Sequence, residues 1–125
     1  MPARKSSRQI EKQEQDALVE WFRMAYPDCL LFAIPNQLVR GPYQGASMVR
    51  GGLVVGMPDL MLAVGNKTYH GLFVEMKRPA RWDCKAGELS VAQQDILRRL
   101  NDAGYLALVC YGFDDAQRAI VDYMS

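Results

Sequence analysis

The sequence predicts an α/β fold with a central mixed sheet flanked by helices, its elements in the order α-β-β-β-α-β-α. Apolar residues recur at helical spacing in three segments, short apolar runs lie between them, and Gly or Pro stands near most boundaries. The chain has 125 residues, enough for one domain with its own core. We therefore expect a single domain over residues 1–125, with a flexible basic N-terminus over about residues 1–8.

The first half of the chain predicts one helix and three strands. Residues 10–25 carry an apolar stripe at helical spacing, and Pro27 ends the helix. Short apolar runs near Gly or Pro predict strands at residues 30–34, 59–64 and 71–77. The last two strands are joined by a turn at residues 65–67. We expect residues 36–52 to form a long loop, and a loop of that length in a compact domain is more often functional than not.

The second half predicts two helices around a fourth strand. Ser90 is a natural N-cap, and Gln93 stands three residues after it, the spacing of a capping box. Gly104 ends that helix. An apolar strand follows at residues 105–111, and a last helix runs from Asp114 or Asp115 to about residue 123.

Composition excludes several classes of protein and site. No apolar run approaches the roughly 18 residues of a membrane span, and the N-terminus has no apolar signal-peptide segment, so we expect a cytoplasmic location. The three cysteines are widely spaced and odd in number, which argues against a disulfide framework and a structural zinc site. With a single histidine, any metal must be bound by carboxylates.

The net charge is only +1, but the basic residues cluster. They gather at the N-terminus, in the central loop and after residue 76: Arg4, Lys5 and Arg8; Arg40 and Arg50; Lys77, Arg78, Arg81 and Lys85. Clusters of this kind can follow a phosphate backbone, although they are also typical of a solvated surface.

One acidic pattern carries most of the chemical information. Asp59 opens one predicted strand, and Glu75 and Lys77 stand two residues apart in the next. Side chains alternate along a strand, so Glu75 and Lys77 share one face while Met76 points the other way. Two carboxylates beside an ammonium group can hold a hard divalent cation and position a water molecule for hydrolysis.

Each of these residues also has a plain structural interpretation. Asp59 follows Pro58 and is acceptable as a turn residue that begins a strand. Glu75 and Lys77 are acceptable as an ion pair on a solvated sheet face. However, Glu75 stands in an apolar run, where an unpaired carboxylate would be costly to bury, so a metal or Lys77 must compensate it.

The spacing resembles the PD-(D/E)XK nuclease signature, and the order of elements resembles the αβββαβ core of that restriction-endonuclease-like superfamily, here with a C-terminal helix. The finer resemblance is to its VRR-NUC branch. Six family motifs occur in the family order: Glu11-x-x-x-Gln15 with Trp21, Ile34-Pro35-Asn36, Gly56-Met57-Pro58-Asp59, Glu75-Met76-Lys77, Leu89-Ser90-x-x-Gln93 and Ala103-Gly104-Tyr105. Met57 departs from the valine or other β-branched residue usual there, but it keeps the position apolar.

The resemblance implies a Mg²⁺- or Mn²⁺-dependent DNA endonuclease that hydrolyses phosphodiester bonds. It implies that Asp59, Glu75 and the backbone carbonyl of Met76 bind the metal and that Lys77 is catalytic. It also implies a carboxylate from the first helix and a glutamine, Gln93, that orients the site. A plain capping role for Gln93 is the alternative.

Two residues compete for the first-helix carboxylate. Gln15 lies one turn beyond Glu11 on the same face, and the family places its acid four residues before the glutamine. Glu14 instead lies in line with Leu18 and Trp21, near the edge of the expected core. We therefore favour Glu11 as a further metal ligand, acting directly or through water.

Candidate DNA contacts come from the central loop and from the segment after the motif: Asn36, Arg40, Tyr43, Arg50, Arg78 and Arg81. Small members of the family look like phage or prophage proteins that dimerise and cut branched DNA. The resemblance thus implies a homodimer acting on substrates such as four-way junctions, with no nucleotide cofactor and no membrane partner. Residues 53–55 or the strand edge at 105–111 would meet the second copy. The alternatives are an inactive DNA-binding member, a sequence-specific nuclease and a monomeric flap or end nuclease.

Overall fold

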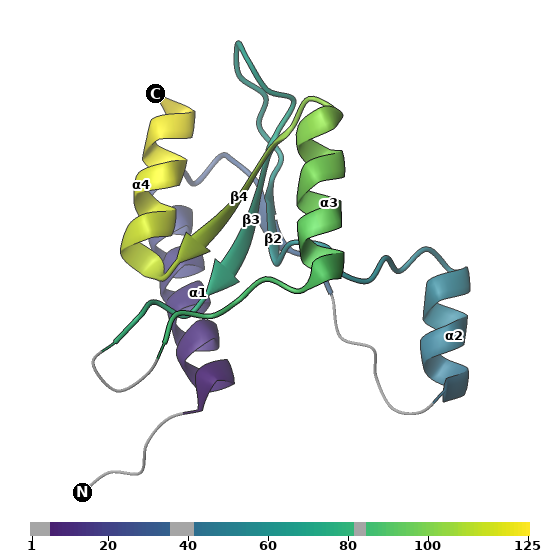
Figure 1. Cartoon of the computed structure of the whole chain (residues 1–125). Coiled ribbons are helices and arrows are strands. Elements are labelled where there is room, and N and C mark those ends of the chain that lie inside the picture. Colours follow the sequence, from purple (N-terminus) through teal and green to yellow (C-terminus); the bar gives the residue numbers. More distant parts are fainter. Residues whose placement is uncertain (1–5, 36–41, 82–84) are drawn as a thin grey trace, which may run out of the picture.

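A computed structural model describes residues 6–35, 42–81 and 85–125. Within them, one sheet has the strand order β1-β2-β3-β4 (Figure 1). The strands are β1 (Leu31–Ala33), β2 (Leu60–Leu62), β3 (Leu72–Lys77) and β4 (Leu106–Tyr111). Each strand lies inside its predicted range, and the predicted mixed sheet flanked by helices is confirmed.

The pairing of the strands places the acidic motif. β2 is antiparallel to β1 and to β3, whereas β4 runs parallel to β3. Leu60 pairs with Val74 in this antiparallel register. The residue before Leu60, Asp59, therefore lies opposite the residue after Val74, Glu75. The two predicted carboxylates are therefore neighbours across the β2–β3 hairpin.

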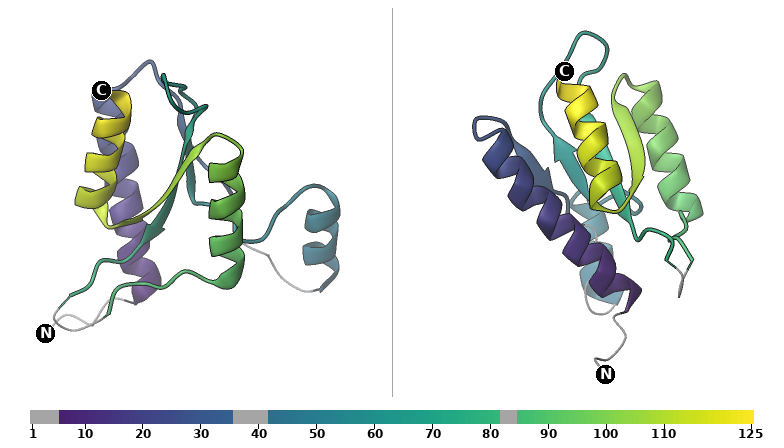
Figure 2. Two further views of the ribbon diagram at one scale, coloured as in Figure 1. Left: turned by 45° about the horizontal axis from the view of Figure 1, so that its top comes forward. Right: turned by 90° about the vertical axis from the view of Figure 1, so that its left-hand side faces the viewer.

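Three helices cover the two faces of this sheet. Figure 2 shows α1 (Ser7–Ala25) and α4 (Phe113–Met124) on one face and α3 (Val91–Asp102) on the other. Alternate residues of β3 point to the α1 and α4 face, where the largest group of buried apolar side chains lies. Its members include Leu18, Phe22, Leu60, Leu72, Val74, Met76 and Ile120.

The caps explain where two helices begin. Ser6 and Gln9 form a capping box, so α1 starts at Ser7, three residues before the predicted start at Ile10. The apolar stripe marks only the part of the helix that packs on the sheet, whereas the cap lies one turn earlier. The predicted Ser90–Gln93 capping box of α3 is confirmed.

The prediction of a long loop at residues 36–52 was wrong, because α2 (Pro42–Arg50) lies within it. Pro42 occupies the first helical position, where its fixed φ favours a helix and its missing N–H is not needed. Gly51 and Gly52, the latter with φ of +112°, follow the last turn. Several glycines in this segment concealed the helix in the sequence. Figure 1 shows α2 standing apart from the sheet.

Within the described ranges, no helix combines the length and the apolar character needed to cross a membrane.

Candidate active site

Asp59 is fixed against β3 by the backbone. Its Oδ2 atom accepts a hydrogen bond of 2.7 Å from the N–H of Met76. In a strand, the N–H and the carbonyl of one residue point to the same side, so the Met76 carbonyl also faces the Asp59 side. One carboxylate and one main-chain oxygen are thereby brought to the same edge of β3.

Glu75 and Lys77 share a face, as predicted. The Lys77 Nζ atom lies 3.9 Å from Oε1 of Glu75, and Gln93 Nε2 donates a hydrogen bond of 3.1 Å to the same oxygen. Glu75 is only 3% exposed. Among the described residues, its second oxygen, Oε2, has no hydrogen-bond partner.

Gln93 serves the helix and the site at once. Its side-chain oxygen accepts a hydrogen bond of 2.9 Å from the N–H of Ser90, which completes the capping box of α3. Its side-chain nitrogen is left to donate to Glu75. The capping role of Gln93 is confirmed, and the hydrogen bond to Glu75 is compatible with the predicted role of Gln93 in the site, because the oxygen and the nitrogen of one amide make the two contacts.

Gly56 allows the loop before Asp59 to touch the first turn of α3. Its φ is +93°, and a Cβ atom there would lie 2.7 Å from the backbone carbon of Ala92 and 3.0 Å from the nitrogen of Gln93. Any side chain would push the two segments apart. This glycine thus fixes the distance between the segment that carries Asp59 and the helix that carries Gln93.

The buried carboxylate is strongly perturbed. Burial, followed by the negative charge of Asp59, raises the pKa of Glu75 from 4.5 to about 9. The positive charge of Lys77 opposes this rise, and the charge of Glu11 adds to it. A carboxylate in this position needs a proton or another positive charge to be stable.

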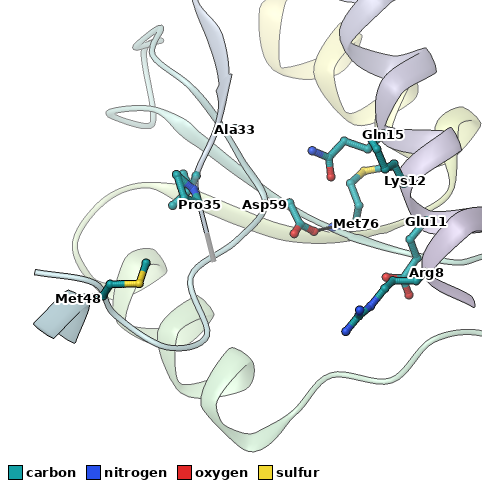
Figure 3. Close-up of a pocket in the computed structure, with 10 residues that line it drawn as sticks. Arg8, Glu11, Lys12, Gln15, Ala33, Pro35, Met48, Asp59 and Met76 are labelled. Atoms are coloured by element: carbon teal, nitrogen blue, oxygen red, sulfur yellow. Dashed lines mark hydrogen bonds between the residues drawn. The ribbon is translucent and has the colours of Figure 1, made fainter. Parts of the chain in front are cut away.

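Glu11 lies on the wall of an open cleft of about 560 Å³ that also exposes Asp59 and Met76 (Figure 3). The buried Gly87 lies between Glu11 and Lys77, since an added Cβ would stand 3.3 Å from Glu11 Oε1 and 3.2 Å from Lys77 Cδ. The absence of a side chain at Gly87 leaves room for both of these side chains.

Glu14 points elsewhere. Its Oε2 atom accepts a hydrogen bond of 3.0 Å from the N–H of Phe113, the first residue of α4. Gly112, at the N-cap, has no side chain to accept a hydrogen bond from the first turn of α4. The Glu14 carboxylate, from α1, accepts one of these backbone hydrogen bonds instead. Of the two competing residues, Glu11 faces the cleft and Glu14 does not.

The described residues include no group of three or more His, Cys, Asp or Glu side chains arranged to hold a metal ion. The donors that could hold one are the carboxylates of Asp59 and Glu75 with the Met76 carbonyl. All three are oxygens, as Mg²⁺ and Mn²⁺ prefer. The unpartnered Oε2 of Glu75 and its raised pKa fit a cation at this place.

The comparison with known families decides the classification. The model of the VRR-NUC domain matches residues 9–114. The chain belongs to the VRR-NUC domain family. It is therefore a nuclease domain, and this implies DNA as its substrate.

A solved structure described as a VRR_NUC domain protein shares the fold of this VRR-NUC domain. The two align with a TM-score of 0.75 and 22% identity, over 98% of this chain and 91% of the other. None of the curated proteins matches the chain.

The predicted DNA contacts of the VRR-NUC domain fall into two groups. Asn36, Arg40 and the side chain of Tyr43 lie outside the described residues. The others are Arg50, Arg78 and Arg81. Arg50 is exposed at the end of α2. The other two are engaged by the chain itself: Nε of Arg78 donates to the carbonyl of Lys85, and Nη2 of Arg81 lies 4.0 Å from Oε1 of Glu14.

The structure also brings residues to the cleft that the sequence analysis did not assign to the site. Arg8 and Lys12 lie one turn before and one residue after Glu11 on α1, and both line the cleft. Helical spacing from Glu11 could have found them. Met48 on α2 also lines the cleft, but no sequence signal pointed to it because the helix itself was missed.

The raised pKa of Glu75 leads us to expect a pH-dependent stability. The unfolded carboxyl titrates near its ordinary pKa of 4.5 and the folded one near 9, so its contribution is complete below 4.5 and is lost as pH rises toward 9. In chelator, the melting temperature should fall between about pH 6 and about pH 9. Glu75→Gln should remove most of that fall, and the exposed Glu88→Gln should not. Equal slopes in all three proteins would contradict the burial argument.

The separate positions of Glu11 and Glu14 should separate two effects. Glu14→Gln removes a charge from the start of α4 and should lower the free energy of unfolding by roughly 1 kcal/mol while cleavage is largely kept. Glu11→Gln should leave the denaturant midpoint nearly unchanged and lower metal-dependent cleavage. Denaturation and cleavage assays on both variants test this, and the reverse pattern would show that the wrong helical turn was chosen.

Proposed function

We propose that this VRR-NUC domain is a Mg²⁺- or Mn²⁺-dependent endonuclease that hydrolyses DNA phosphodiester bonds, with selectivity for branched substrates such as four-way junctions. The observation that carries the proposal is the buried Glu75 carboxylate. It has one oxygen held by Gln93 near Lys77 and, among the described residues, one oxygen without a hydrogen-bond partner. It lies next to Asp59, which lines an open cleft.

The metal would be held by Asp59, Glu75 and the carbonyl of Met76. When bound there, a divalent cation would neutralise the carboxylates, polarise the phosphodiester and acidify a water molecule. Glu11 stands on the cleft wall, and the described residues include no three-carboxylate group arranged to hold a metal, so Glu11 would act through water. The hydrogen bond from Met76 N–H holds Asp59 in place, and the amide of Gln93 orients Glu75.

Lys77 supplies the positive charge of the protein itself. Its ammonium group is largely buried, and within the described part of the chain the nearest carboxylate oxygen, Oε1 of Glu75, lies at 3.9 Å. At that distance the group is not committed to a short ion pair, so it can turn toward a phosphate oxygen. There it would stabilise the negative charge that develops during hydrolysis.

The intact site argues against an inactive DNA-binding member. An unpartnered buried carboxylate oxygen beside a second carboxylate costs stability, and a protein that only binds DNA gains nothing from it. The arrangement supports an active hydrolase, in which a cation offsets that cost.

We further propose a homodimer, because two incisions on a branched substrate need two sites in two-fold relation. Of the two candidate surfaces, residues 53–55 are the better supported, since Val54 and Val55 are 43% and 51% exposed. They adjoin α2, which stands apart from the sheet (Figure 1).

The edge of β4 is the weaker candidate because side chains of its own chain cover it. Asn101 bonds both the N–H and the carbonyl of Ala107, and Asp115 accepts from the N–H of Tyr111. A strand from a second copy would have to displace these bonds before it could pair.

Removal of any one central group should abolish cleavage. We expect Asp59→Asn, Glu75→Gln and Lys77→Ala each to lower the rate at least about a hundredfold, because each removes a metal ligand or a transition-state charge. Cleavage is measured on linear and four-way DNA with Mg²⁺, Mn²⁺ or chelator. Asp95→Asn, an exposed acid on α3, is the matched control. A folded variant as active as the unsubstituted protein would sink the assignment.

Assembly and substrate choice should change together. We expect light scattering to give a dimer that prefers a four-way junction over linear duplex, single strand, flap and nick. Val54→Asp with Val55→Asp should give a monomer that loses this preference, whereas Val121→Asp, at an exposed apolar position on α4, should remain dimeric. A stable wild-type monomer that ignores junctions would end the dimer proposal but not the nuclease proposal.

A further inference from the structure

We propose that Arg8 and Lys12, on the cleft face of α1, bind the DNA backbone beside the scissile phosphate. The inference rests on the proposed nuclease function, and it names the surface that holds the substrate strand. The sequence indicated Arg8 only as part of the basic N-terminal cluster, and it did not indicate Lys12.

The first step is position. Arg8, Glu11, Lys12 and Gln15 follow each other at helical spacing and span about 10 Å along the helix axis. All four line the same cleft as Asp59. Figure 3 shows Arg8, Glu11 and Gln15 projecting from α1 on the side of Asp59. The Lys12 ammonium group is bonded to Asp16 and would have to turn from it to meet a phosphate.

The second step is the shape and chemistry of the cleft. Among the described residues, the wall opposite α1 is apolar and is formed by Ala33, Ile34, Pro35 and Met48. A cleft with cations on one wall and apolar groups on the other suits a nucleic-acid strand, which has phosphates on one side and sugars and bases on the other. Its volume of about 560 Å³ falls in the range of sites that enclose a small molecule, so it would take a short stretch of the strand.

The third step is the availability of the charges. Among the described residues, Arg8 makes no ion pair, and Lys12 pairs only with Asp16, with its side chain 75% exposed. An exposed pair of this kind contributes little, so a phosphate can replace Asp16 at small cost. By contrast, Arg78 and Arg81 are engaged by the loop and by Glu14.

The fourth step is electrostatic need. Glu11 and Asp59 line the cleft, and the buried Glu75 lies next to Asp59, with the ammonium group of Lys77 3.9 Å from its Oε1 atom. A DNA backbone that approaches this group is repelled unless other cations compensate. Arg8 and Lys12 stand where that compensation is required.

The test compares two double variants that remove the same charge. Arg8→Ala with Lys12→Ala and the control Arg98→Ala with Arg99→Ala each change the formal net charge from +1 to −1. The control residues are exposed cations in helical ion pairs on α3, and they do not line the cleft. A third variant, Arg8→Lys with Lys12→Arg, keeps both charges.

Binding is measured in an Asp59→Asn background, so that DNA is not consumed. We expect the cleft variant to bind a duplex at least about tenfold more weakly, and the slope of log affinity against log salt to fall by about 2, because each lost phosphate contact removes roughly 0.9. In cleavage assays with intact Asp59, KM should rise while kcat stays within about twofold. The control and the charge-keeping variant should match the parent.

Two results would overturn the inference. One is an equal salt slope for the cleft and control variants, and the other is a loss of kcat with unchanged KM in the cleft variant. If the unsubstituted protein cuts no DNA with either metal, the proposed function fails, and the salt slopes still decide whether α1 contacts the backbone.

Discussion

The burial of one carboxylate in an apolar sheet is the constraint on which the rest of the site depends. Glu75 lies between Val74 and Met76, both in the core, and it has almost no contact with solvent. An unsatisfied charge in such a place costs several kcal/mol. The neighbouring elements meet that cost only in part: α3 brings an amide to one oxygen, Lys77 brings a charge to within 3.9 Å, and Oε2 is left unpartnered. Because the compensation is only partial, the carboxylate still requires a proton or a further positive charge, and this is the basis for the proposed metal site.

Much of this site could be predicted because its information is local. The period of two along β3 puts Glu75 and Lys77 on one face, and the pairing of two strands joined by a short connection brings Asp59 beside them. The capping box of α3 is a four-residue pattern, and it positions Gln93 before any tertiary contact is considered. The role of Gly56 could not be predicted from the sequence. A side chain there would clash with the backbone of Ala92, which lies 36 positions further along the chain.

The rest could not be predicted because it depends on contacts between distant segments or on weak local signals. Glu14 bonds the N–H of Phe113, 99 positions away, and nothing near Glu14 in the sequence indicates that partner. Arg81 looked available for DNA, but that same carboxylate lies 4.0 Å from it. The helix α2 was missed since glycines and a proline suggested a loop, and its contribution of Met48 to the cleft was missed with it.

The β4 edge of the sheet is covered by side chains of the same chain, and this limits how two copies of the chain could meet. Side chains of α3 and α4, Asn101 and Asp115, take hydrogen bonds that a neighbouring strand would otherwise make with β4. An edge covered in this way is protected from pairing with a strand of another chain. The cleft opens instead toward α1, β1 and α2. Among the described residues, its α1 wall carries the charged groups and the facing wall is apolar. On α1, Arg8 and Lys12 lie on either side of Glu11 along the helix, so positive charge and a carboxylate face the cleft from the same helix. The carboxylate of Asp59 lies across from them, and the two cations offset part of the negative charge of the cleft without reaching the buried Glu75.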